Sequence, residues 1–173
     1  MPSNTYVLIS SVTVGAGGAS SIDFTSIPAT YTDLQIVLSG RCNNASIVSN
    51  IKWTFNGSAS GYSGKELYGD GSSAGSGNGG TTSSYIQLGY AVGDTATANT
   101  FSNTACYIPN YAGSNNKSIS IDSVAETNAT SQYSDLGAGL WSNTAAITQV
   151  TLTPASGSFK QYTTAYLYGI KNS

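Results

Sequence analysis

Few residues of this chain are of the types that carry chemistry. Histidine is absent, and the two cysteines, Cys42 and Cys106, lack a CxxC spacing. Histidine-dependent nucleophilic catalysis and zinc or redox motifs are therefore excluded. A glycosidase needs only two carboxylates, and Asp122 and Glu126 would share one face of a strand. The alternative is that both are solvated residues at a strand edge or turn. We favour that alternative and predict that the protein is not an enzyme.

A second candidate is the stretch "GSGNGG", Gly75 to Gly80, which matches the letters G-x-G-x-x-G. A dinucleotide site needs that pattern between a strand and a helix, with an acidic residue about 20 positions later. Here the strand-like sequence "TTSSYIQLGY" follows, and no acid lies at that distance. In the longer stretch "GDGSSAGSGNGG", Gly69 to Gly80, Asp70 is the one acid, and a single carboxylate is too few for a calcium site. We therefore predict no cofactor and no metal, and a loop tip that contacts a neighbouring subunit or solvent.

Charge is scarce throughout the chain. Charged residues make up 8% of the sequence, against about 25% in typical domains, so hydroxyl and amide groups must solvate the surface. The six basic residues are scattered singly, which argues against a nucleic-acid partner. No apolar run approaches a membrane span, and the N-terminus lacks the features of a secretory signal. We expect synthesis in a cytoplasm and two buried, reduced thiols, while a single bridge between strands stays open.

The elements that would position these residues are strands. Twelve tyrosines and many β-branched residues recur with period-2 alternation between Gly-, Pro- and Asn-rich turns. About nine or ten short strands predict one all-β domain over residues 1–173 that is a sandwich, a jelly roll or a barrel, and of these we favour the antiparallel β-sandwich. Trp53 and Trp141 are assigned to the core. Two apolar sets are in phase along their predicted strands: Tyr6, Leu8, Val12 and Val14, and Leu136, Ala138 and Leu140, the latter with glycines between them.

Residues from about 57 to 84 are dominated by Gly and Ser and predict one long loop. Tyr62, Tyr68 and Asp70 in this segment are the candidate partner contacts. The other interpretation of the two tyrosines is that they hold the loop against the body of the domain.

Three stretches together carry a resemblance to a known family. They are "SIDFTSIPATYTDLQIVLSGR" (Ser21 to Arg41), "YIPNYAGSNNKSISIDSVAETNAT" (Tyr107 to Thr130) and "GLWSNTAAITQVTLTPASGSFKQYTTAYLYGIK" (Gly139 to Lys171). They resemble small virion proteins of tailed phages, notably phages of cyanobacteria and other aquatic bacteria. The resemblance covers both ends of the chain and leaves out the middle.

The resemblance implies a role on the virion and supplies no site residues. The first role is a capsid cement, or decoration, protein of jelly-roll type. It would bind the major capsid protein on the outer shell, as a homo-oligomer and most simply a trimer. The second role is a receptor- or carbohydrate-binding module of a tail fibre or spike.

Overall fold

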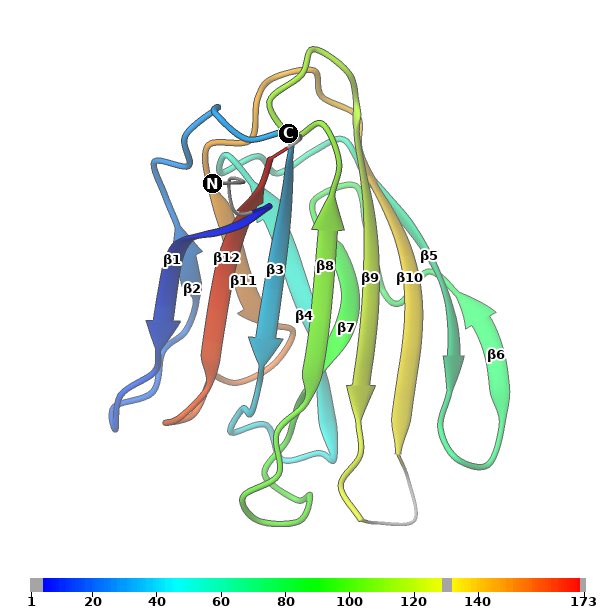
Figure 1. Ribbon diagram of the computed structural model, residues 1–173. Helices are drawn as coiled ribbons and strands as arrows, with labels where there is room; N and C mark the ends of the chain where they lie inside the picture. The colour runs from blue at the N-terminus through cyan, green and yellow to red at the C-terminus, as the bar shows by residue number, and fades with distance from the viewer. Residues whose placement is uncertain (1–4, 129–131, 172–173) are drawn as a thin grey trace.

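A computed structural model describes residues 5–128 and 132–171. Figure 1 shows that these residues are built from strands and connecting turns. The twelve strands in chain order are β1 (Tyr6–Thr13), β2 (Ile22–Phe24), β3 (Asp33–Ser39), β4 (Val48–Phe55), β5 (Tyr62–Gly69), β6 (Ala74–Gly77), β7 (Ile86–Val92), β8 (Asn103–Ile108), β9 (Lys117–Ala125), β10 (Tyr133–Trp141), β11 (Val150–Pro154) and β12 (Thr164–Ile170).

The strands form two antiparallel sheets. The larger has eight strands in the order β1-β12-β3-β8-β9-β10-β5-β6, and the smaller has four in the order β2-β11-β4-β7. Figure 1 shows the four-stranded sheet behind the eight-stranded one. The prediction of an all-β antiparallel sandwich is confirmed. None of the described segments forms a helix with the length and apolar character needed to span a bilayer.

The core lies between the sheets and follows the period-2 alternation of the strands. In β4, for example, Ile51, Trp53 and Phe55 are buried, while the residues between them are partly exposed. Trp53 and Trp141 both lie in this core, as predicted. The indole Nε1 of Trp53 donates a hydrogen bond to the carbonyl oxygen of Leu88 at 2.9 Å, which ties β4 to β7 across their sheet.

Both cysteines are buried free thiols, which confirms the favoured interpretation. Burial raises the pKa of each thiol above its ordinary value, because an apolar environment disfavours the thiolate. Cys42 and Cys106 therefore act as small apolar residues of the core.

The first strand departs from its predicted face. A β-bulge between Leu8 and Ser10 shifts the pairing with β12 by one residue. Such a shift exchanges the two faces of a strand. Tyr6 and Leu8 are therefore exposed, whereas Val12 and Val14 lie on the core side.

The predicted loop at 57–84 is the main error of the sequence analysis. It contains β5 and β6, the two strands that the predicted count lacked. Both pair at the far edge of the larger sheet, β5 along the whole of β10 and β6 along β5. Glycine and serine have low strand propensity, so pairing with an existing sheet, and not local preference, makes these residues extended.

In strand β10 the apolar set lies on the outward side, and the core side is that of Trp141. Leu136 and Ala138 point outward, and Gly137 and Gly139 face the core. The glycines make room for β7: a Cβ atom on Gly139 would lie 2.7 Å from Cδ1 of Ile86, and one on Gly137 would lie 2.9 Å from Cδ1 of Leu88. The two sheets therefore approach closely at this edge.

We predict that Gly139→Val destabilises the protein by about 1–3 kcal/mol, because its methyl groups would overlap Ile86. The matched control is Ala138→Val on the exposed side of the same strand, which should change stability by about 0.5 kcal/mol or less. Urea unfolding measures both. Equal losses of stability in the two variants would show that the packing of β7 does not depend on these glycines.

Candidate functional site

Of the three predicted contact residues, Tyr62 is placed differently from expectation. It is buried, its hydroxyl accepts a hydrogen bond from the Phe55 amide at 2.8 Å, and its ring stacks on Trp141 at 6.1 Å between centroids. It is too enclosed to be an exposed partner contact. The second interpretation holds for it, because the ring fastens the start of β5 to the core.

Tyr68 and Asp70 remain near the surface. Tyr68 is half-buried beside a pocket described below. Asp70 is partly exposed in the β5–β6 turn, where one carboxylate oxygen accepts hydrogen bonds from the amides of Ser72 (2.9 Å) and Ser73 (2.7 Å). These bonds lower the pKa of Asp70 to about 2. Its carboxylate is therefore occupied in shaping its own turn.

Asp122 and Glu126, the acid pair suggested by spacing, form no enclosed site. Both side chains are exposed, and Glu126 lies beyond the end of β9, where its carboxylate accepts a hydrogen bond from the Asn128 amide at 2.6 Å. In the described ranges, no group of three or more His, Cys, Asp or Glu side chains is arranged to hold a metal ion.

The acids that the fold does enclose are Glu66 and Asp135. Glu66 pairs with Gly137 and Asp135 pairs with Tyr68, so the two acids are diagonal neighbours on the core side of β5 and β10. Their exposed fractions are 9% and 4%. Asp135 Oδ2 accepts a hydrogen bond from the Gly89 amide at 2.7 Å. Glu66 Oε2 and Asp135 Oδ1 are buried and have no hydrogen-bond partner.

Burial perturbs both acids. Burial raises the pKa of Glu66, the nearby charge of Asp135 raises it further, and the backbone amide of Gly79 opposes these effects. Burial also raises the pKa of Asp135, against the opposing effect of the Gly89 amide. Sequence reasoning missed this pair because Glu66 lay in the supposed loop. The available signal was that Asp135 has the same strand parity as Trp141, a residue already assigned to the core.

Glu66 lines a polar pocket of about 460 Å³ at one end of the sandwich. Strands β4, β5, β6, β7 and β10 and the glycine-rich turn contribute to its wall. We call it the acid–tyrosine pocket, and its principal side chains are Asn50, Glu66, Tyr68, Asn78, Tyr90 and Tyr133.

The "GSGNGG" stretch forms part of this pocket. It continues from β6 into a turn in which Gly79 and Gly80 have φ values of +60° and +84°. The turn rests on β7 of its own chain, since Gln87 Nε2 donates a hydrogen bond to the Gly79 carbonyl at 3.0 Å. Ser76, Asn78 and Gly80 are nevertheless exposed, so the predicted contact with a neighbouring subunit or solvent stays a prediction. A Cβ on Gly79 would lie 2.4 Å from the backbone oxygen of Gln87 and 2.9 Å from Glu66 Oε2, so glycine allows the turn to pack closely on both β7 and the acid.

A second feature is the outward side of the eight-stranded sheet, which we call the outer face. Opposite residues on paired strands share a side, and Leu136 is opposite Leu67 while Tyr168 is opposite Leu8. Seven of the eight exposed large hydrophobic residues of the described ranges lie on this side, and the eighth, Tyr162, lies in the turn before β12. The seven are Tyr6, Leu8, Leu67, Tyr107, Val124, Leu136 and Tyr166.

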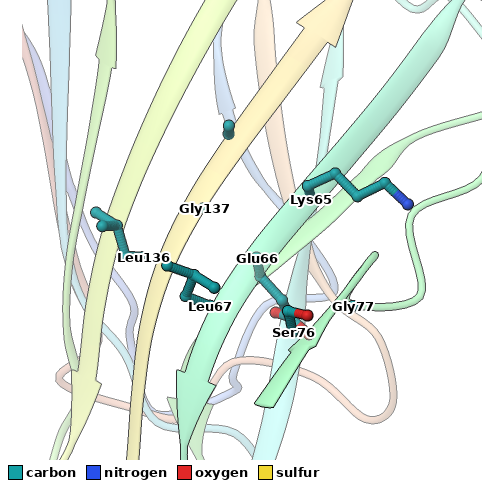
Figure 2. Close-up of a pocket in the computed structure, with 8 residues that line it drawn as sticks. Lys65, Glu66, Leu67, Ser76, Gly77, Leu136 and Gly137 are labelled. Carbon is teal, nitrogen blue, oxygen red and sulfur yellow. The ribbon is translucent and has the colours of Figure 1, made fainter. Parts of the chain in front are cut away.

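At one end of the outer face, Leu67 and Leu136 border a shallow groove of about 610 Å³. Figure 2 shows these two side chains meeting from neighbouring strands, with Lys65 extending away from them. At the other end, the Tyr166 and Tyr168 rings are stacked at 6.4 Å, and Tyr6 meets Tyr168 edge-on at 6.4 Å. The face thus combines an apolar end with a tyrosine-rich end.

Comparison with known proteins adds little. No protein-family model matches this chain, and no curated protein matches it. A solved structure that it matches is galectin LEC-6 of Caenorhabditis elegans, with 9% identity, a TM-score of 0.28 and coverage of 97% of this chain and 96% of that chain. A TM-score this low carries no argument about function.

The buried acids predict an unusual dependence of stability on pH. Because folding raises both carboxyl pKa values, the folded state keeps these protons to higher pH than the unfolded chain. Their contribution to stability therefore falls as pH rises from the ordinary carboxyl range, about 4, through the raised values.

Glu66→Gln removes one of these charges and should raise the melting temperature at pH 7 by about 2 °C or more. At pH 3, where both carboxyls are protonated, the variant and the unmodified protein should melt alike. Calorimetry at the two pH values measures the difference. A variant that melts lower at pH 7 would contradict an unpaired buried charge at Glu66.

Proposed function

We propose that this chain is a non-enzymatic virion protein of a tailed phage. It binds the major capsid protein on the outer shell, as a homo-oligomer and most simply a trimer, and stabilises the shell. The observation that carries the proposal is the outer face. A monomeric protein seldom exposes so many large apolar side chains on one side of a sheet, and such a patch marks an interaction surface.

The chemistry of the outer face supports binding to another protein. Tyrosines and leucines alternate with serines across it, and its charges on the paired strands include Asp33, Lys65 and Asp122. Interface cores are enriched in aromatic residues and depleted of charge. A sheet face is also broad and rigid, so little conformational entropy is lost when it docks. In a trimer, three copies of the face would act together, and the gain in affinity would come from multivalency.

We further infer a jelly-roll topology, as the resemblance to phage virion proteins implies. In a jelly roll, eight strands pair first with last, second with seventh, third with sixth and fourth with fifth, alternately in two sheets. Here β2–β11 and β4–β7 pair in the smaller sheet, and β3–β8 and β5–β6 pair in the larger. In this interpretation the β9–β10 hairpin is inserted between β8 and β5, and β1 and β12 extend the edge beyond β3.

The outer face is tested by Leu136→Asp, which places a charge at its exposed apolar end (59% exposed). We expect binding to purified capsids to weaken about tenfold or more, with little change in melting temperature. Tyr162→Ser is the matched control, because Tyr162 is 68% exposed but lies off the face. Co-sedimentation with capsids measures both variants. No capsid binding by the unmodified protein, or equal effects of the two variants, would contradict the proposal.

The tyrosine-rich end of the outer face favours a second candidate, a receptor- or carbohydrate-binding module of a tail fibre or spike. Stacked tyrosines offer flat surfaces to the apolar faces of sugar rings. In that case the protein should be retarded on host-cell polysaccharide and not bind capsids. Tyr166→Ser should abolish the retardation, and Leu136→Asp should leave it unchanged.

A further inference from the structure

The acid–tyrosine pocket is lined by Glu66, whose buried Oε2 has no hydrogen-bond partner; Oδ1 of the neighbouring Asp135, which does not line the pocket, is also buried and without a partner. Nearly all buried polar groups in folded proteins have a hydrogen-bond partner, and an orphaned one lowers stability. The cost is greater for a carboxylate than for a neutral group. The side chain of Glu66 is nine-tenths buried, lines the pocket and lies against its glycine turn. This arrangement indicates that a ligand supplies the missing hydrogen bond to Glu66.

The charge of the pocket selects a cation. No lysine or arginine is among the described residues that line the pocket. Glu66 lines it, and Asp135 lies close enough to Glu66 to raise the pKa of Glu66. Burial raises the pKa of Tyr90, and the charges of the same two acids raise it further, so their field reaches this tyrosine. An anion would be repelled here, and a neutral molecule would leave the two charges uncompensated. A cation would relieve the repulsion between the acids and supply donors to the unsatisfied oxygens.

The remaining side chains favour an ammonium group over a metal ion. Two acids fall short of the carboxylate-rich oxygen set that a hard divalent cation takes, and no larger acid cluster is present in the described ranges. Tyr68, Tyr90 and Tyr133 instead offer aromatic rings, with Tyr90 and Tyr133 packed at 5.2 Å between centroids. Aromatic rings beside a carboxylate suit an ammonium group through cation–π attraction and a charge-assisted hydrogen bond.

The chain already pairs ammonium groups with tyrosine rings elsewhere. Lys52 Nζ lies 4.8 Å from the centroid of Tyr85, and Lys171 Nζ lies 5.6 Å from that of Tyr31. Those sites are filled by the chain's own lysines. The acid–tyrosine pocket has the same kind of ring together with the buried Glu66, and no lysine of the described residues lines it.

We propose that the acid–tyrosine pocket binds an ammonium group, with Glu66 as its principal hydrogen-bond acceptor and the tyrosine rings as its walls. The group comes either from a free polyamine or from a lysine side chain of another protein, since both present the same chemistry. Glu66, Ser76 and Gly77 line both this pocket and the groove at the end of the outer face, but the binding of an amine does not depend on the capsid-binding proposal.

Titration of the isotope-labelled protein, followed by its backbone amide signals, tests the proposal. The probes are spermidine and Nα-acetyl-lysine N-methylamide, and Nα-acetyl-norleucine N-methylamide serves as the chain-matched neutral control. We expect saturable shifts at Gly77, Gly79 and Tyr90 with at least one of the two amines, at a Kd on the order of 1 mM or tighter. The neutral control should cause none. Spermidine alone would identify a free polyamine, and the lysine derivative would identify a side chain.

Glu66→Gln should weaken amine binding about tenfold or more, because it removes the charged acceptor. Asp122→Asn is the matched control: it removes the same unit of charge from an exposed position and should leave binding unchanged. Equal shifts with the neutral control, retained binding in Glu66→Gln, or no saturable shift with either amine would overturn the proposal. So would saturation of the same amides by calcium chloride or by neutral sugars in place of the amines.

Discussion

The packing of β7 onto the glycines of β10 is the contact on which the rest of this structure depends. Gly137 and Gly139 have no side chains to hold the sheets apart, so Leu88 and Ile86 fill the space over them. The close approach brings the backbone of β7 within hydrogen-bonding distance of Asp135, which accepts the Gly89 amide. A larger residue on the core side of β10 would force the sheets apart at this edge.

This contact also creates the acid–tyrosine pocket. With β7 close to β10, Glu66 and Asp135 are enclosed between the sheets and lose most of their hydration. The turn after β6 closes over Glu66 because Gly79 can approach its carboxylate. A chain with only eight acidic residues thus holds two of them in its interior with unsatisfied oxygens. Burial of this kind is costly, and it is therefore informative about function.

The unequal size of the sheets explains the outer face. The four-stranded sheet covers one side of the eight-stranded sheet. The apolar and aromatic residues on the other side of the larger sheet are exposed to solvent. Because this surface has few charges, its interactions should depend little on salt. The two surfaces differ in kind: the outer face is broad and nearly uncharged, whereas the pocket is small and acidic.

Much of the architecture follows from local sequence. Alternation placed most strands, the sandwich and the core tryptophans correctly, because side-chain direction along a strand has a fixed period. The sequence alone could not place β5 and β6, since Gly- and Ser-rich residues become strands only by pairing with β10. For β10 it gave opposite indications, since the apolar set Leu136, Ala138 and Leu140 lies on one side and the core residue Trp141 on the other; the glycines point inward because β7 fills the space above them. The pairing of Glu66 with Asp135 depends on that same contact between distant segments, so only the tertiary structure decided the site.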